Sequence, residues 1–291
     1  MSYTQTACAP LSQTVASAIY CLLQIVFPEL TALSDVLPLL RHIWKILQQY
    51  DSTDDLVLFQ QDIAGFFNLV THPRMISTVE FLIARYAALQ GLDLQDDPIL
   101  SVAHNQQERL QRIFRGRWRR TSRSYHPIHL RDLPALVSHL LASSYFTVVL
   151  TVFRQCQGAS MGSPLAPALC SAVALFREYC FLCSFPTSSW RYATGLVLRA
   201  RYVDNVFFLG PTHMLHTDSF QAVAQPFFYG RPLEMEYVTD ETLLGFVLYT
   251  SQRTITFRQP PHLTLIRSNR TAGSPDMALA GFFTRGILIC A

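Results

Sequence analysis

The stretch Leu196–Leu209, LVLRARYVDNVFFL, decides how the rest of the chain is interpreted. Two apolar, β-prone runs, Leu196 to Val203 and Val206 to Leu209, flank the pair Asp204-Asn205. Asp and Asn tolerate the positive φ angles of a tight two-residue hairpin, so the stretch predicts strand, turn and strand with a carboxylate at the tip. Many surface turns carry these residues for backbone reasons alone. Strands this apolar are buried, however, and a buried carboxylate needs a partner, for which a metal ion is one candidate.

Composition and charge narrow the class of protein. The 291 residues are 50% hydrophobic, enough to bury a large core in one large or two unequal domains. No run reaches the ~18 uninterrupted apolar residues of a membrane span, so we expect no membrane partner. No basic region precedes the first apolar stretch, so we expect no secretory signal. The seven cysteines are scattered and odd in number, which favours reduced thiols in an intracellular protein, nuclear or cytoplasmic.

Arginine supplies almost all of the positive charge, because Lys45 is the only lysine. One short window contains seven arginines: Arg109, Arg112, Arg115, Arg117, Arg119, Arg120 and Arg123. A solvated basic helix end and a phosphate-binding surface explain this window equally well. Trp118 and Tyr125 beside it slightly favour nucleic acid, because aromatic rings stack on bases.

Periodicity and propensity predict a mixture of helices and strands. Helices are expected within Val15–Gln49, with breaks at Pro28 and Pro38. Four further helices are expected at Met75–Leu89, Ser101–Phe114, Leu133–Ala142 and Leu165–Leu182. The expected strands outside the hairpin are Leu56–Phe59 and Tyr145–Phe153, the second rich in aromatic and β-branched residues.

Two carboxylates meet if the predicted strands are neighbours. Asp62 stands at the end of an apolar strand and Asp204 at the hairpin tip. Divalent cations relieve the repulsion of converging carboxylates, and polymerases and nucleases use two such metals about 3.5–4 Å apart for phosphoryl transfer. Magnesium suits this role because it takes a few carboxylates and completes its shell with water and substrate phosphates. The glycine-rich loop Gln157–Pro164 permits close backbone approach to a sugar or phosphate.

Three blocks in this order resemble the A, B and C motifs of reverse transcriptases. They are DIAGFF from Asp62, FRQCQGASMGSPLAPALC from Phe153, and RYVDNVFFL from Arg201. The middle block is most similar to the reverse transcriptases of Penelope-like retroelements. Further on, ETLLGFVL at Glu241–Leu248 resembles the primer-grip motif, and DMALAGFFTRGILI at Asp276–Ile289 resembles the first thumb helix.

The resemblance implies an α+β right-hand polymerase palm, an antiparallel sheet with helices packed on one face, with reduced fingers and a truncated thumb. It divides the chain into a helical fingers-like region (1–55), a palm (56–250) with an Arg-rich insertion at 105–125, and the start of a thumb (251–291). It covers roughly Leu56 to Leu248.

The resemblance also implies residue roles. Asp62 and Asp204 would bind two Mg²⁺ ions, or Mn²⁺, with the carbonyl of Ile63 as a further ligand, and Asn205 would complete the catalytic set. Phe67, beside Phe66, would stack under the incoming sugar and exclude a ribose 2′-hydroxyl. The other residues implied to contact nucleotide or template are Gln157, Gly158, Gly162, Ser163 and Pro164. The residues implied to position the primer are Leu244, Gly245 and Phe246. Without the resemblance, Phe67 could be an ordinary core aromatic and the two glycines simple turn formers.

The sequence departs from the family at two catalytic positions. Asn205 replaces the usual second aspartate, which keeps one oxygen donor but drops a charge, so weaker metal binding is expected. The family's lysine after the hairpin has no counterpart, because no lysine follows Lys45. Arg231 or His262 could take its place, although arginine is a poor proton donor at neutral pH.

The function implied is an RNA-directed DNA polymerase of retroelement origin, which transfers deoxynucleotides to a primer 3′-hydroxyl by a two-metal mechanism. Its partners would be an RNA template, a DNA or RNA primer and deoxynucleoside triphosphates. A viral-type RNA-dependent RNA polymerase is an alternative that Asp204-Asn205 favours and Phe67 disfavours. A decayed or repurposed palm that binds nucleic acid without catalysis is the third hypothesis.

Overall fold

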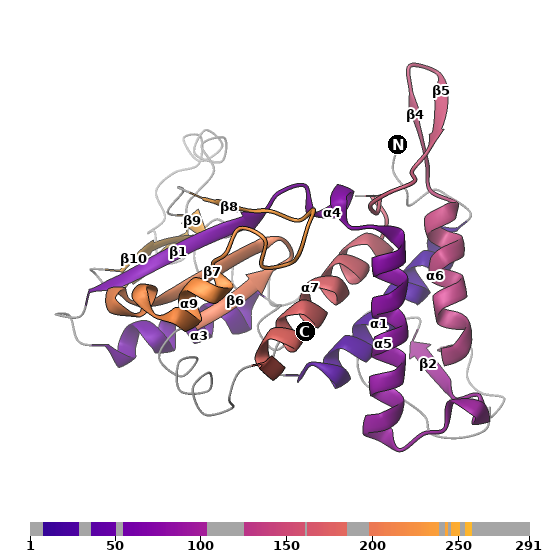
Figure 1. Cartoon of the computed structure of the whole chain (residues 1–291), viewed down its shortest axis with the longest axis horizontal. Helices are drawn as coiled ribbons and strands as arrows, with labels where there is room; N and C mark the ends of the chain where they lie inside the picture. Colours follow the sequence, from indigo (N-terminus) through magenta and orange to yellow (C-terminus); the bar gives the residue numbers. More distant parts are fainter. Residues whose placement is uncertain are drawn as a thin grey trace, which may run out of the picture.

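The computed structural model describes nine segments of the chain: residues 8–28, 36–50, 55–103, 125–160, 162–184, 198–238, 242–243, 246–250 and 254–257. Within them, a four-stranded antiparallel sheet lies beside a layer of helices (Figure 1). Its strand order is β6-β7-β1-β8. The bounds are β1 Leu56–Ile63, β6 Leu198–Tyr202, β7 Asn205–Pro211 and β8 Met235–Tyr237.

The helical layer and the sheet face beside it form the main core. Its helices are α1 (Ala9–Val26), α5 (His72–Gln90), α6 (Leu133–Ala142) and α7 (Leu165–Ser184). Helices α1, α5 and α7 pack against one another, and α6 packs on α1 and α5. The shorter helices are α4 (Phe66–Leu69), α9 (Asp218–Val223), η2 (Leu94–Asp96), η3 (Leu130–Asp132) and η4 (Thr212–His216). The predicted helices at Met75–Leu89, Leu133–Ala142 and Leu165–Leu182 are confirmed.

The two faces of the sheet are covered differently. Phe59 of β1 and Phe208 of β7 lie on one face and contact Phe220 of α9. On the opposite face, Phe207 and Leu209 of β7 pack against α3 (Val36–Gln49). The expectation that helices cover one face alone is therefore wrong. Because β1 and β7 are apolar on both sides, each of their faces requires a cover.

Two proline predictions have different outcomes. Helix α1 ends at Val26, just before Pro28, so the predicted break there is confirmed. Helix α3 begins at Val36 and contains Pro38, so the second predicted break is wrong. Proline is tolerated in the first turn of a helix, where its missing N–H has no intrahelical partner to lose.

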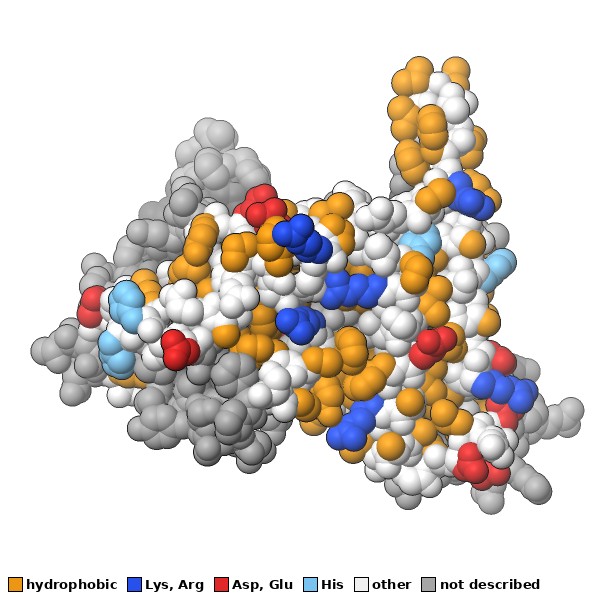
Figure 2. Space-filling view, in the orientation of Figure 1, with side chains coloured by type: hydrophobic (Ala, Val, Ile, Leu, Met, Phe, Trp, Pro, Cys, Tyr) orange, Lys and Arg blue, Asp and Glu red, His pale blue; other side chains and the backbone are white. Residues whose placement is uncertain are grey.

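The predicted strand Tyr145–Phe153 is instead a short hairpin of β4 (Tyr145–Val148) and β5 (Thr151–Arg154). It projects from the body of the molecule, and side chains along it are apolar (Figures 1 and 2). Val149 and Leu150 form its turn with φ of 46° and 67°. Every residue of both strands is exposed, so their aromatic and β-branched residues give strand propensity without burial.

Smaller sheets complete the described part of the chain. Strand β2 (Ile99–Ala103) pairs with β3 (Tyr125–His129). Residues 101–103, predicted to begin a helix, therefore belong to a strand, and the rest of that predicted helix lies outside the described residues. A three-stranded sheet contains β9 (Thr242–Leu243), β10 (Phe246–Tyr249) and β11 (Thr254–Phe257). The predicted thumb helix also lies outside the described residues.

Helices α1 and α7 have the length and mean hydropathy, 1.4 for each, of a membrane span. Both pack in the main core, with 56% of each apolar window buried inside the molecule. Core helices of this length pass the same compositional test, so these two helices are weak evidence for a membrane. The cysteines within the described segments are free thiols, and Cys183 is exposed.

Candidate active site

Asp62 and Asp204 are brought together by the pairing of β1 with β7. Asp62 lies directly opposite Asn205 in the antiparallel register. The N–H of Ile63 donates a hydrogen bond to the carbonyl of Asp204, with an N···O distance of 3.1 Å. The end of β1 is thereby fixed against the β6–β7 turn, and the two aspartates that the sequence analysis singled out share one end of the sheet.

The turn that carries Asp204 is displaced by one residue from its predicted position. Tyr202 pairs with Asn205, so the two loop residues are Val203 and Asp204 rather than Asp204 and Asn205. Val203 takes the positive φ, 57°, that was expected of Asp or Asn. Asn205 is unavailable for the loop because it is paired in the sheet on both sides, to Tyr202 and to Asp62.

The charge of the Asp62 carboxylate is only partly compensated. Burial raises the pKa of Asp62, and the negative charges of Asp204 and, to a smaller extent, Glu236 raise it further, while a backbone hydrogen bond from Ile63 acts in the opposite direction. Its Oδ1 is buried and has no hydrogen-bond partner among the described residues. A cation at this position would supply the missing partner and favour the ionised form.

Glu236 is a third acidic residue at the site that the sequence analysis missed. It lies on β8 directly opposite Asp62 in the register, on the other side of β1 from Asn205. Directly opposed residues of antiparallel strands project from the same face of a sheet. Its signal was present in the sequence, because buried Leu233 and Met235 alternate with exposed Glu234 and Glu236, the period of a half-buried strand.

The donor set suits a metal that takes few protein ligands. No group of three His, Cys, Asp or Glu side chains close enough to hold a metal ion occurs among the described residues. The carboxylates of Asp62 and Asp204, with an unpartnered oxygen on Asp62, fit Mg²⁺, which keeps several waters or substrate oxygens in its shell. The residues present therefore fit a substrate-completed magnesium site better than an all-protein one.

Gly158 joins the glycine-rich loop to the segment that follows Asp62. Its φ is 75°, and a Cβ built there would lie 2.5 Å from the carbonyl oxygen of Phe67. Its N–H donates to Val70 at 3.0 Å, and the N–H of Ala159 donates to Phe67 at 2.7 Å. Close approach of two backbones, in addition to the turn, therefore requires glycine at this position. Gly162 is exposed and is not among the residues with positive φ.

The remaining loop residues predicted at the site make structural contacts. The Gln157 side chain is exposed and donates to the carbonyl of Leu69 at 3.1 Å. Ser163 is buried, contacts Ser12 of α1 with an Oγ···Oγ distance of 3.0 Å, and accepts a hydrogen bond from the N–H of Leu165. Half-buried Pro164 immediately precedes α7. This loop therefore fixes the start of α7 against α1.

The two aromatic residues predicted to face the nucleotide differ in burial. Phe66 is 2% exposed and belongs to the main core. Phe67 is half-buried at the edge of that core, with its ring centroid 5.9 Å from that of Phe66. The exposed part of Phe67 is therefore the surface available to a ligand.

Several predicted residues lie outside the described residues. They are the seven arginines of the 109–123 window, the primer-grip residues Leu244 and Gly245, and His262. The backbone of Phe246 lies in β10, paired with Leu243 and Phe257. Arg231 is exposed, with its guanidinium 4.8 Å from the centroid of the Phe227 ring.

No family model matches the sequence, and no curated protein matches it. The fold is similar to that of telomerase from Candida albicans, solved in complex with a TWJ fragment of telomeric RNA, with a TM-score of 0.60 and 12% sequence identity. It is also similar to apo telomerase from Candida tropicalis, with a TM-score of 0.58 and 12% identity. These matches cover 88% of this chain but 40% and 41% of the telomerase chains. The chain therefore has a reverse-transcriptase-like fold and spans about two-fifths of the length of these proteins.

Proposed function

We propose that the chain is a template-directed nucleotidyltransferase, an RNA-directed DNA polymerase of retroelement origin that uses two magnesium ions. The observation that carries the proposal is the junction of Asp62 and Asp204 at the end of β1, where a buried carboxylate oxygen has no partner among the described residues. The likeness of the fold to two telomerases supports the polymerase class. The similarity of the middle block to Penelope-like elements supports the retroelement origin.

The proposed chemistry assigns a role to each part of the site. Asp62, Asp204 and the carbonyl of Ile63 would hold the metals, which when bound activate the primer 3′-hydroxyl and stabilise the leaving oxygen. The half-buried ring of Phe67 would stack under the sugar of the incoming deoxynucleotide. The loop at Gly158, fixed by backbone hydrogen bonds to the carbonyls of Val70 and Phe67, would lie beside template and nucleotide. Positioning and charge neutralisation then supply most of the rate enhancement.

Asn205 modifies the site without removing its oxygen ligands. Its amide nitrogen lies 3.4 Å from Oδ1 of Asp204, a long contact that directs the amide towards the carboxylate. One negative charge is lost relative to a pair of aspartates, whereas Glu236 provides a charge on the other flank of Asp62. We expect binding of the metals to be weaker than with two aspartates, and stronger in Asn205→Asp.

The test is primer extension on an RNA template with deoxynucleotides, in Mg²⁺ and in Mn²⁺, for wild type and Asp62→Ala. We expect wild-type extension and a loss of about 10³-fold or more in the variant, because the metal clamp provides most of the charge stabilisation. Asp96→Ala, which removes an exposed carboxylate in η2, is the matched control and should extend like wild type.

Unaltered extension by Asp62→Ala would refute the metal assignment. Folded wild-type protein that extends with neither metal would instead favour a palm that binds nucleic acid without catalysis. Salt-sensitive RNA binding by that inactive protein would then distinguish a binding module from a chain without nucleic-acid affinity.

A further inference from the structure

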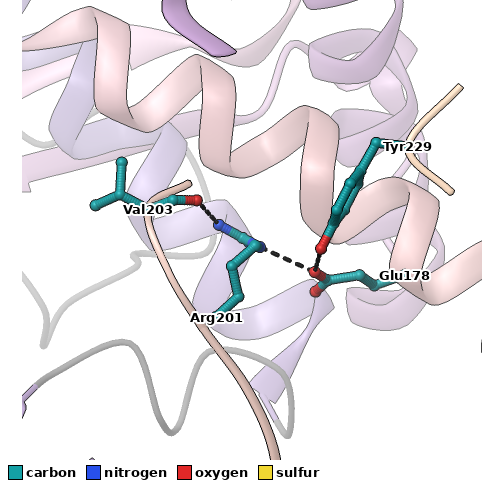
Figure 3. Close-up of polar contacts among 4 residues, drawn as sticks. All are labelled: Glu178, Arg201, Val203 and Tyr229. Atoms are coloured by element: carbon teal, nitrogen blue, oxygen red, sulfur yellow. Dashed lines mark hydrogen bonds and ion pairs between the residues drawn. The ribbon is translucent and has the colours of Figure 1, made fainter. Parts of the chain in front are cut away.

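The side chains of Arg201, Glu178 and Tyr229, from separate parts of the chain, meet at one place (Figure 3). Nε of Arg201, on β6, donates to Oε1 of Glu178, on α7, at 2.9 Å. The hydroxyl of Tyr229, between α9 and β8, donates to the same oxygen at 2.7 Å. We call these three residues the Arg201 cluster. They connect the hairpin to α7 and to the segment before β8.

The Arg201 cluster is buried. The side chains of Arg201 and Glu178 are 6% and 3% exposed, and Tyr229 is 0% exposed. Desolvating two charges costs about as much as their attraction returns, so a buried ion pair is weak evidence for a purely stabilising role. Such a pair does fix the orientation of the groups that it contacts, because a planar guanidinium holds its hydrogen-bond partners in a fixed geometry.

Arg201 also contacts the backbone directly before Asp204. Its NH1 group donates to the carbonyl of Val203 at 2.7 Å. Val203 has a φ of 57°, a costly conformation for a β-branched residue that persists where its surroundings enforce it. This carbonyl belongs to the peptide bond that leads into Asp204. One guanidinium, oriented by Glu178 and Tyr229, therefore fixes the peptide that sets the direction of the Asp204 side chain.

We propose that the Arg201 cluster is a positioning device for Asp204. It holds the strained Val203 peptide so that the Asp204 carboxylate faces Asp62 and the pair can share a divalent cation. Arg201 acts through the peptide and not on substrate, so it is a positioning residue. The proposal rests on the proposed function only in taking Asp204 to be a metal-binding carboxylate.

Two variants test the device at different strengths. Arg201→Lys keeps the charge, but an ammonium cannot reproduce the fork that holds both Glu178 and Val203. Tyr229→Phe keeps the buried ring and removes only the hydroxyl that orients Glu178. The matched control is Arg177→Lys, because Arg177 precedes Glu178 on α7 and donates to Phe228, next to Tyr229, without contacting the hairpin.

Three quantities are measured for each protein: kcat and KM for the deoxynucleotide, the affinity for Mn²⁺ by electron paramagnetic resonance, and amide hydrogen exchange of residues 202–206. We expect kcat and Mn²⁺ affinity to fall about tenfold or more in Arg201→Lys and about threefold to tenfold in Tyr229→Phe, with nucleotide KM nearly unchanged. Exchange in residues 202–206 should accelerate in both variants. Arg177→Lys should match wild type in all three measurements.

The outcomes separate this proposal from the proposed function. If wild type binds Mn²⁺ but does not extend a primer, the polymerase assignment fails, while Mn²⁺ affinity and exchange still test the Arg201 cluster. If wild type extends and folded Tyr229→Phe matches it in kcat, Mn²⁺ affinity and exchange, the positioning role is overturned and the polymerase assignment stands. Should Arg201→Lys fail to fold, Tyr229→Phe alone decides.

Discussion

The two faces of the four-stranded sheet carry charge in opposite ways. On the face covered by α3, Asp62 has a buried, unpartnered oxygen and acidic neighbours in Asp204 and Glu236. On the other face, Arg201 is buried in an ion pair with Glu178, so each of these two charges has an opposite partner. Arg201 and Asp204 are only three positions apart in the β6–β7 hairpin, so local composition does not explain the difference.

The difference indicates what each face does. Unbalanced carboxylates lower the stability of the free protein and are retained where a ligand completes them. A balanced buried pair contributes little net stability but makes one geometry much better than its alternatives. Val203 connects the two arrangements. Arg201 donates a hydrogen bond to its carbonyl, and its strained peptide bond leads directly into Asp204.

Breaking the Arg201–Glu178 ion pair should have the largest effect on the free energy of unfolding. Glu178→Gln leaves the Arg201 guanidinium buried without an opposite charge, and removing one partner of a buried pair costs about 3–5 kcal/mol. The free energy of unfolding, measured by urea denaturation, should fall by that amount. Glu80→Gln, on the exposed surface of α5, should change it by less than about 0.5 kcal/mol. Equal stability of the two variants would show that the charge balance of the Arg201 cluster is unimportant.

Relieving the backbone strain at Val203 should have a smaller effect on the free energy of unfolding, and of opposite sign. Positive φ at the first loop residue alone is the pattern of a turn in which glycine is preferred, so Val203→Gly removes the strain. We expect a gain of up to about 1 kcal/mol in unfolding free energy, offset in part by the chain entropy of glycine. Primer extension should not improve, since a freer turn holds Asp204 less firmly. A variant that is both more stable and faster would contradict the role assigned to the strain.

The sequence predicted the meeting of Asp62 and Asp204 but not the Arg201 cluster, and the reason is physical. The convergence of Asp62 and Asp204 follows from two local patterns, an apolar strand and a hairpin, which need only be neighbours. Arg201, Glu178 and Tyr229 are brought together across 23 and 51 positions by the packing of α7. No periodicity specifies which carboxylate a buried arginine will meet.

Backbone conformation caused two other errors. The one-residue displacement of the turn and the hairpin within Tyr145–Phe153 both depend on valine or leucine adopting positive φ. Propensity assigns such residues to strand interiors, so the sequence extends the strand through them. The helices Leu133–Ala142 and Leu165–Ser184 were predictable because their apolar runs are long and their prolines, Pro134 and Pro167, lie in the first turn.

The smallest expected effect is the change in stability caused by the partly compensated charge of Asp62. The pKa of Asp62 is raised by burial and by Asp204 above its ordinary value of 3.8, so the folded protein binds this proton more tightly than the unfolded chain. The ionised carboxylate then destabilises the metal-free fold as pH rises through the folded pKa, and the penalty is absent below the unfolded value. Asp62→Asn should therefore be more stable than wild type at pH 7, by a fraction of a kcal/mol up to about 1 after solvent screening.

This advantage should disappear near pH 3, where wild type is protonated in both states, and added Mg²⁺ should stabilise wild type but not Asp62→Asn. Thermal denaturation at pH 7 and pH 3, with and without Mg²⁺, measures all of these differences, with Asp96→Asn as the exposed control. If Asp62→Asn were less stable than wild type at pH 7 without metal, Asp62 would have a favourable partner after all. The carboxylate face would then be as balanced as the Arg201 cluster, and the contrast between the two faces would lose its functional meaning.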